Sequence, residues 1–591
     1  MSSIRLREDA GLPLFEPPER LTAPGHVAPD LAIACPATDR PFRLEAERIS
    51  VEGSERGPAT SIRIDGQRVI GRIQAGEGVV ANVVLSPGRI RRERIGPGGS
   101  LQETMLAAPT LPWVALHWAP VGGALSVQVL PEARVERYRV NGGLATVADP
   151  GSNQVLALAL SPASGPWAAE PHAQGGLVLR HGGAPSPLTL LIAYGPPETV
   201  RTAFRAAGHL TTHEVRAIGR PGHDPLTVST GARELDDAVA WMTSRLRHGI
   251  LHAEHGEPEG TDHARPWLWA GLGSVAIGDG DGALRCVRAL QRAGDTEAAA
   301  LLAARVALAT GQVDALLGHA DVLLAEAKAG ADPALRRLAR RTVADALRYA
   351  APDDVLELLR EGTERAPAPS GRRLPTIGHP VETDGTGSWL TSMLERKGTS
   401  APAVTPAVGG RGPAEQALAE ALRAWSDFAS ESSEAWAAWR MLVQQGITPG
   451  HHGGGSWDAL LKPPAVTGAL LAAMAYGWLG TSPDAPVGRL SLAPRLPEHL
   501  RSFRVRGIPI GDSRVALSYE RTEGAHGFTV DIERGRVPPV LVFEATVPGQ
   551  VGRVMLDGTP VDPHISQGSR GSTVRLQIPL DAPHTIELER G

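Results

Sequence analysis

The chain has 591 residues, a formal net charge of −5, 42% hydrophobic residues and 21% charged residues, which is the usual composition of a soluble globular protein. It is too long for one ordinary hydrophobic core, and its length predicts about three or four domains. Its slight acidity gives no electrostatic support for nucleic-acid binding. No run approaches the ~18 apolar residues of a membrane span, and the N-terminal residues lack the apolar centre of a signal peptide.

The two cysteines, Cys35 and Cys286, fall in different predicted domains, so no disulfide is expected and a reducing compartment is compatible with the sequence. We therefore expect a cytoplasmic protein with no nucleic-acid and no membrane partner. The sequence leaves the oligomeric state open, a homo-oligomer included.

The first part of the chain predicts an antiparallel β-sandwich. Residues 1–38 are rich in proline and irregular, and are expected to form an arm on the surface. Residues 39–208 contain many short alternating runs separated by Gly/Pro turns, with no helix before the last segment. Asp65-Gly66 lies between two such runs and predicts a tight hairpin, because this dipeptide tolerates the positive φ of the turn.

The middle of the chain changes to helical periodicity. A short helix at about 196–207 closes the sandwich, and residues 209–230 are expected to form a linker. Residues 231–486 are predicted to form a helical domain of about eleven helices, in which apolar residues recur every three or four positions. The expected helices begin near Glu234 and continue at 266–277, 281–293, 295–310, 312–329, 332–350, 353–364, 388–397, 413–430, 432–446 and 457–480.

The last part, residues 487–591, returns to alternating runs and predicts a second, smaller β-sandwich. Asp557-Gly558 marks another hairpin turn in it. The expected fold class is therefore an N-terminal antiparallel β-sandwich, a helical domain and a C-terminal β-sandwich.

Three short motifs carry a resemblance to a known superfamily. They are the helix entry Thr383–Leu390 (TDGTGSWL), the pair Ser456-Trp457 with Gly477–Gly480 around the last helix, and Leu490–Pro497 (LSLAPRLP) at the start of the C-terminal sheet. Together with the order of domains, they resemble the six-hairpin glycosidases, among them glucoamylases, debranching-enzyme glucosidases and maltose phosphorylases. The resemblance implies an (α/α)6 barrel in residues 231–486.

The chain also departs from that pattern. The run Ala264–Ala270 (ARPWLWA) stands where the superfamily has a Gly-Arg-Asp signature, and the helices number nearer eleven than twelve. The loop before the last helix offers His451 and His452 where catalytic members have a carboxylate. A divergent or inactive member therefore stays among the alternatives.

Glycosidic bond cleavage requires two carboxyl groups, one acting as acid on the leaving oxygen and one as base or nucleophile. Asp384, with Glu382 two residues before it, is the first choice for the acid. Asp458 at the start of the last helix, or Glu257 in the loop after the first helix of the domain, is the candidate base. The alternative is structural: Asp384 and Asp458 are also good turn or helix-cap residues, and Glu257 lies among other acids in a loop that can simply be solvated.

Nine of the 12 tryptophans lie from Trp241 to Trp478, in the helical domain. Trp269, Trp389 and Trp457 stand at predicted helix starts, where an indole face can pack against a pyranose ring, although some of them can equally be core residues. His451 and His452 can hydrogen-bond sugar hydroxyls or transfer protons. No histidine spacing fits a zinc site, and neither a metal nor a cofactor is expected.

The sequence is therefore interpreted as a glycoside hydrolase-like protein that acts on α-linked gluco-oligosaccharides by carboxylate acid/base catalysis, with carbohydrate as its partner. Whether it is an active enzyme stays open. Two alternatives remain: a non-catalytic carbohydrate-binding or structural relative, and a disaccharide phosphorylase.

Overall fold

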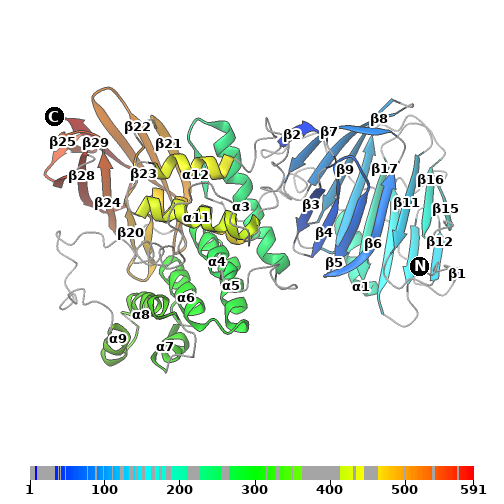
Figure 1. Cartoon of the computed structure of the whole chain (residues 1–591), viewed down its shortest axis with the longest axis horizontal. Helices are drawn as coiled ribbons and strands as arrows, with labels where there is room; N and C mark the ends of the chain where they lie inside the picture. The colour runs from blue at the N-terminus through cyan, green and yellow to red at the C-terminus, as the bar shows by residue number, and fades with distance from the viewer. Residues whose placement is uncertain are drawn as a thin grey trace, which may run out of the picture. The chain divides into compact units, whose positions relative to one another are not determined.

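The computed structural model describes most of the chain; outside the description lie short turns, a few single positions, and residues 1–6, 9–32, 209–225, 254–264, 326–331, 362–412, 430–433 and 445–463. The chain forms two compact units. One comprises residues 1–223 and 251–257, and the other comprises residues 224–250 and 258–591. β-Sheets lie at both ends of the sequence and helices lie in the middle, in the predicted order (Figure 1).

The first unit is built on two sheets of ten and seven strands, ordered β1-β12-β13-β14-β17-β10-β9-β8-β7-β2 and β15-β16-β11-β6-β5-β4-β3. Among the described strands of these two sheets, all neighbours pair antiparallel except β1 with β12. Helix α1 (Pro197–Gly208) follows the last strand, as predicted. The strands are β1 Arg7–Glu8, β2 Ile33–Pro36, β3 Pro41–Ala46, β4 Ile49–Ser54, β5 Ala59–Ile64, β6 Gln67–Ala75, β7 Val79–Ser86, β8 Arg89–Gly96, β9 Gly99–Ala107, β10 Trp113–Ala119, β11 Leu125–Pro131, β12 Arg137–Asn141, β13 Leu144–Ala148, β14 Val155–Ser161, β15 Trp167–Pro171, β16 Leu177–His181 and β17 Leu188–Gly195.

The predicted hairpin at Asp65-Gly66 is confirmed. The two residues have φ values of 52° and 75°, the positive values that a type I′ turn requires, and they join β5 to β6. Strand β8 was not predicted, because its four arginines conceal the alternation. Arg92 on β8 is 2% exposed, and its guanidinium donates to Glu103 and to the carbonyl oxygens of Ser54 (3.1 Å) and Gly57 (2.5 Å). This buried pair ties the two sheets together.

The second unit contains the helices, and they fall close to the predicted ranges (Figure 1). The expected helix at 388–397 and the start of the expected helix at 457–480 lie outside the described residues. The helices are α3 Arg233–Ala253, α4 Pro266–Ala276, α5 Gly280–Arg292, α6 Thr296–Thr310, α7 Leu316–Leu324, α8 Pro333–Leu347, α9 Asp353–Arg360, α11 Pro413–Ala429, α12 Ala435–Gln444, α13 Pro464–Ala472 and the π-helix η2 Ala473–Trp478.

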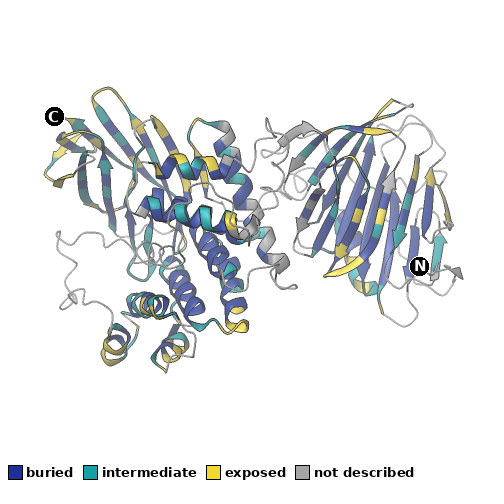
Figure 2. Cartoon of the chain, viewed as in Figure 1, coloured by how far each residue is buried: buried dark blue, intermediate teal, exposed yellow. Residues whose placement is uncertain are grey.

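Helices α4, α6 and α13 are buried on nearly every side, whereas α7 and α9 expose one face (Figure 2). Apolar residues fill α4 and α13 all round, and a helix without a polar face must lie inside a domain. Helices α4 and α6 run parallel: Arg265, just before α4, contacts Asp295, just before α6, while Gly271 further along α4 faces Leu302 further along α6.

Helices α4 and α13 approach each other at their backbones. A Cβ atom added to Gly468 would lie 2.3 Å from the carbonyl oxygen of Trp269, and one added to Gly273 would lie 2.4 Å from the Cα of Gly468. These are backbone atoms, so no side-chain movement could make room. The two glycines therefore allow two fully buried helices to pack backbone against backbone.

The last sandwich in the chain has sheets of seven and five strands, ordered β18-β21-β22-β23-β29-β25-β26 and β19-β20-β24-β28-β27. Its hairpin at Asp557-Gly558 is confirmed by φ values of 51° and 74°. The strands are β18 Thr227–Ser229, β19 Ser482–Asp484, β20 Arg489–Leu492, β21 Ser502–Ile510, β22 Ser513–Arg521, β23 Ala525–Arg534, β24 Val540–Val547, β25 Val551–Leu556, β26 Thr559–Val561, β27 His564–Gly568, β28 Gly571–Ile578 and β29 His584–Arg590, with a 3₁₀ turn at Ala485–Val487.

Strand β18 comes from the stretch that was predicted to be a linker. Residues 227–229 pair antiparallel with residues 504–506 of β21, and Val228 points into the core between exposed Thr227 and Ser229. Three residues are too few to show a period, and the partner strand is far away in the sequence. The chain therefore enters the helices from the edge of its C-terminal sheet.

Helices and C-terminal sheets share one aromatic core. Trp478 of η2 contacts Trp436 and Trp439 on one side and Phe503 of β21 on the other, with ring centroids 4.5, 6.2 and 5.1 Å apart, respectively. The contacts continue from Phe503 to Tyr519. Fully burying one large apolar side chain stabilises the fold by about 1.5–3 kcal/mol. This row of buried rings therefore stabilises the packing of the helices on the sheet.

The glycine contact generates the first prediction. Gly468→Ala should lower the free energy of unfolding by about 1–3 kcal/mol, because the added methyl group overlaps backbone of α4. Gly318→Ala is the control: Gly318 lies inside α7 with no atom within 4 Å of the added carbon, so alanine should stabilise by about 0.5–1 kcal/mol. Urea unfolding followed by tryptophan fluorescence measures both. Equal effects of the two substitutions would contradict the close contact.

Acid should weaken the C-terminal sandwich through His526. The ring is 1% exposed and its Nδ1 lies 2.9 Å from the hydroxyl of Tyr519; burial, with smaller effects of Arg590 and Arg521, lowers the pKa of His526 to about 4. The unfolded chain, with a pKa of about 6.5, takes up this proton first. His526 therefore contributes its full stabilisation above pH 6.5 and loses it as the pH falls toward 4.

The expected loss is at most about 3 kcal/mol at pH 4. His526→Gln should remove this pH-dependent loss of stability. The free energy of unfolding of the variant should then fall less steeply between pH 6.5 and 4 than that of the wild type. Chemical denaturation at a series of pH values measures the difference. Parallel pH profiles would show that His526 does not titrate in this way.

Candidate active site: the N-terminal ends of the buried helices

Four helices, α4, α6, α8 and α13 with η2, direct their C-terminal ends toward the C-terminal sheets. Gly278, just after α4, lies against Arg514 of β22; Ala309 near the end of α6 accepts a hydrogen bond from the Gly511 amide at 2.6 Å. Arg348, just after α8, pairs with Asp484 of β19. The last turn of the α13–η2 helix contacts β21, as described above. The N-terminal ends of α4, α6, α8 and α13 therefore point away from these sheets.

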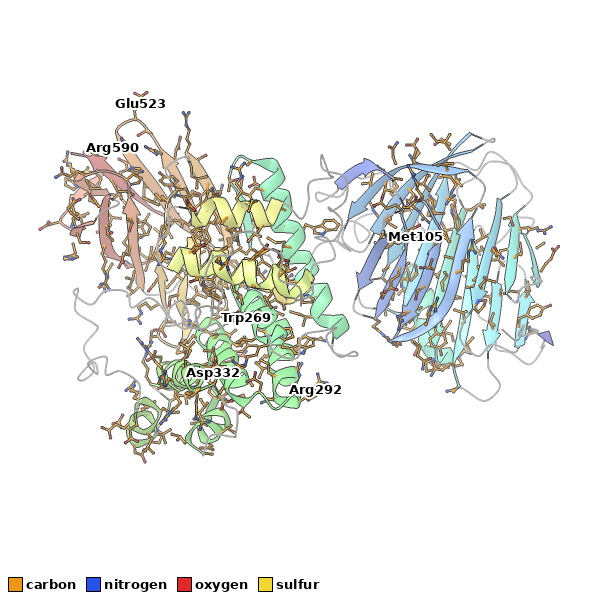
Figure 3. The ribbon with its side chains drawn as sticks, in the orientation of Figure 1. Met105, Trp269, Arg292, Asp332, Glu523 and Arg590 are labelled. Atoms are coloured by element: carbon orange, nitrogen blue, oxygen red, sulfur yellow. The ribbon has the colours of Figure 1, made fainter. Side chains whose placement is uncertain are left out.

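The N-terminal ends of α4, α6 and α8 meet at Arg265. Its Nε donates to Asp295 Oδ2 at 2.6 Å, and its Nη1 lies 3.6 Å from Asp332 Oδ2. All three side chains are partly buried, with 20–26% of each exposed. One guanidinium thus links the starts of three helices, and we call Arg265, Asp295 and Asp332 the Arg265 cluster. Figure 3 labels Asp332 and, among the neighbouring helices, Trp269.

The two aspartates also cap their own helices. Asp295 Oδ1 accepts from the Ala298 amide at 3.2 Å, and Asp332 Oδ1 accepts from the Ala334 and Leu335 amides at 2.9 and 3.3 Å. A carboxylate at this position satisfies free amide groups and complements the positive end of the helix dipole. Each aspartate therefore uses one oxygen for its cap and turns the other toward Arg265.

Arg265 holds a left-handed backbone conformation, with φ 47° and ψ 55°, directly before Pro266. A residue other than glycine pays about 1–3 kcal/mol for such a conformation, and it persists where the surroundings enforce it. Proline at the first helical position explains why α4 begins here. The sequence showed Arg265 only as a departure from a known signature; its ion pairs join residues that are far apart in the chain and could not be anticipated.

A second ion pair stands beside the first. Arg336 of α8 donates to Glu297 of α6 at 2.9 Å, and its other nitrogen donates to the Leu323 carbonyl oxygen at 2.6 Å. Glu297 is 5% exposed. The carboxylates of Asp295, Asp332 and Glu297 therefore all bind helix N-termini or arginines. Their role in the structure is to hold the ends of α6 and α8 in position relative to each other.

The described carboxyl groups whose pKa is raised lie elsewhere. Burial raises the pKa of Asp345 on α8, although Arg348, Arg341, Arg360 and Arg305 each oppose the shift. Asp345 belongs to the last turn of α8, at the end that faces the C-terminal sheets. Its raised pKa is therefore the consequence of desolvation there and does not add an acid to the opposite end.

Most residues predicted to form the site lie outside the described residues. These are Asp384, Asp458, Glu382, Glu257, Trp389, Trp457, His451 and His452. Trp269 is described: it is 1% exposed and packs edge-on against Trp425, with centroids 6.2 Å apart. Its ring therefore belongs to the core, the alternative that the sequence left open for it.

Two further observations concern the part of the chain that the structure describes. It contains no group of three His, Cys, Asp or Glu residues that could hold a metal ion. Nor does any of its helices combine the length and the apolar character needed to cross a bilayer.

No protein-family model and no curated protein matches the chain. Among solved structures, it is similar to a candidate kojibiose phosphorylase from the human microbiome, with 7% identity over 93% of this chain and 92% of that chain and a TM-score of 0.48. It is also similar to a bacterial glucoamylase complexed with acarbose, with 10% identity over 78% of this chain and 96% of that chain and a TM-score of 0.46. A third similar structure is an inverting mannosidase of family GH92 from Bacteroides thetaiotaomicron, with 10% identity over 90% of this chain and 90% of that chain and a TM-score of 0.40.

The two roles of Asp332 can be separated by two substitutions. Asp332→Asn keeps the cap, because asparagine caps as well as aspartate, and removes only the partly exposed charge pair, at a cost of about 0–1 kcal/mol in the free energy of unfolding. Asp332→Ala removes the cap as well and should cost about 1 kcal/mol more. Urea unfolding of the two variants gives the difference. Equal stability of the asparagine and alanine variants would show that Asp332 does not cap α8.

Proposed function

We propose that the protein is a glycoside hydrolase-like enzyme that acts on α-linked gluco-oligosaccharides, with its site at the N-terminal ends of α4, α6, α8 and α13 in an (α/α)6-type barrel. The domains proposed for it are those predicted from the sequence, with the correction that residues 7–8 and 33–36 of the expected arm and residues 227–229 of the expected linker form strands β1, β2 and β18. The observation that carries this proposal is the common direction of these four helices, which gathers their N-terminal ends on one side. Segments that begin different helices can therefore contribute to one site.

The predicted site residues precede α4, α11 and α13 in the sequence. Glu257 lies in the segment before α4, whereas Trp457 and Asp458 lie in the segment before α13, the helix that packs directly on α4. Asp384, in the motif TDGTGSWL, lies in the segment before α11. Carboxylates brought from separate segments to one cleft are what acid/base cleavage of a glycosidic bond requires.

In the proposed mechanism Asp384 protonates the leaving oxygen, and Asp458 or Glu257 activates the attacking water in a single displacement. Glu382, close to Asp384, can help to keep the acid protonated, because neighbouring like charges raise a carboxyl pKa. Trp389 and Trp457 would pack on sugar rings, and His451 and His452 would hydrogen-bond hydroxyl groups. Trp269 supports this arrangement from the core.

Reducing-sugar release over a panel of α- and β-linked oligosaccharides, with and without phosphate, tests the proposal. We expect turnover on α-linked gluco-oligosaccharides that falls about 10²–10⁴-fold in Asp384→Asn and in Asp458→Asn, the usual contribution of one general acid or base. Asp353→Asn is the matched control, because Asp353 is an exposed carboxylate in the first turn of α9; it should leave turnover unchanged.

The same assay separates the alternatives. Turnover that depends on phosphate would make the protein a disaccharide phosphorylase. Absence of turnover on every saccharide, together with an increase in melting temperature on adding sugar, would make it a non-catalytic carbohydrate-binding relative. Absence of both responses would remove the proposed function.

A further inference from the structure

The Arg265 cluster combines features that a simple surface ion pair does not have. A single guanidinium serves two helix caps on different helices, and it does so from a strained, left-handed position at the start of a third. Strain of this kind is retained where the surroundings enforce it, commonly at functional sites. The cluster also lies at the N-terminal ends of the helices, where the proposed site is assigned. The aromatic core packs at the opposite end, toward the C-terminal sheets.

We infer that Arg265 is a positioning residue of the proposed site: it sets the relative placement of the first turns of α4, α6 and α8 without contacting substrate. This inference rests on the proposed function. Arg265 is suited to the task because its planar fork can address two carboxylates at once, with Nε on Asp295 and Nη1 toward Asp332. A lysine offers one charge and no fork.

The physical consequence concerns geometry more than stability. Ion pairs exposed to this extent contribute little to folding, and both helices retain their aspartate caps without Arg265. Loss of the guanidinium should therefore leave the fold intact and let the ends of α6 and α8 shift relative to α4. A displacement of about 1 Å at a catalytic group can reduce turnover about 100-fold.

Arg265→Gly is the sharpest test, because glycine adopts the left-handed backbone without strain and only the side chain is lost. Arg265→Lys is the conservative variant. Arg348→Gln is the matched control: Arg348 forms an ion pair with Asp484 at the C-terminal end of α8, the end opposite Asp332. For each variant, kcat and KM on the best saccharide of the panel and the melting temperature would be measured.

We expect Arg265→Gly to lower kcat at least 10-fold, to change KM less than threefold and to keep the melting temperature within a few degrees of that of the wild type. The kcat of Arg265→Lys should lie between the values of Arg265→Gly and the wild type. Arg348→Gln should lower the melting temperature and keep the wild-type kcat. Unchanged kcat in Arg265→Gly, or an equal loss in Arg348→Gln, would overturn the positioning role while the proposed function stands. A wild-type protein without turnover on any saccharide would overturn both.

Discussion

The helical part of the molecule depends on one steric constraint, the contact between the backbones of α4 and α13 at Gly273 and Gly468. Helix axes usually stay 8–10 Å apart because side chains separate them; two glycines in register remove that separation. Helices that are apolar on every side can then lie against each other, while α5 and α6 pack on α4 and α11 packs on α13. The direction of α4 thereby governs where the N-terminal ends of the buried helices gather.

The two ends of these helices are held by different forces. Toward the C-terminal sheets, the row from Trp439 through Trp478 and Phe503 to Tyr519 buries large rings, each contributing on the order of 1.5–3 kcal/mol. At the other end, the Arg265 cluster consists of partly exposed charges, whose net contribution is about 0–1 kcal/mol per pair. Hydrophobic burial therefore fixes the sheet-facing end, and the proposed site lies at the end held mainly by electrostatics and helix caps.

Much of the architecture could be predicted from the sequence because its signals are local. Hairpins at Asp65 and Asp557 follow from turn chemistry, and the helices follow from three- and four-residue periodicity. Strand β18 and the hydrogen bonds from Arg92 to the carbonyl oxygens of Ser54 and Gly57 could not be predicted, since each depends on a partner distant in the sequence. The Arg265 cluster was missed for the same reason. Trp269 shows a further limit: a tryptophan at a helix start can line a cleft or fill a core, and only packing against Trp425 assigns it to the core.

We propose that carbohydrate binds at the N-terminal ends of α4, α6, α8 and α13. A crystal structure of the full chain with a bound α-linked gluco-oligosaccharide or a non-hydrolysable analogue tests it most directly. We expect sugar density at that end, flanked by two carboxyl groups from the segments that precede α4, α11 or α13. The two carboxyl groups should be about 6.5–9.5 Å apart, as an inverting site requires. Sugar bound at the opposite, sheet-facing end, or at this end without a pair of carboxylates, would contradict it.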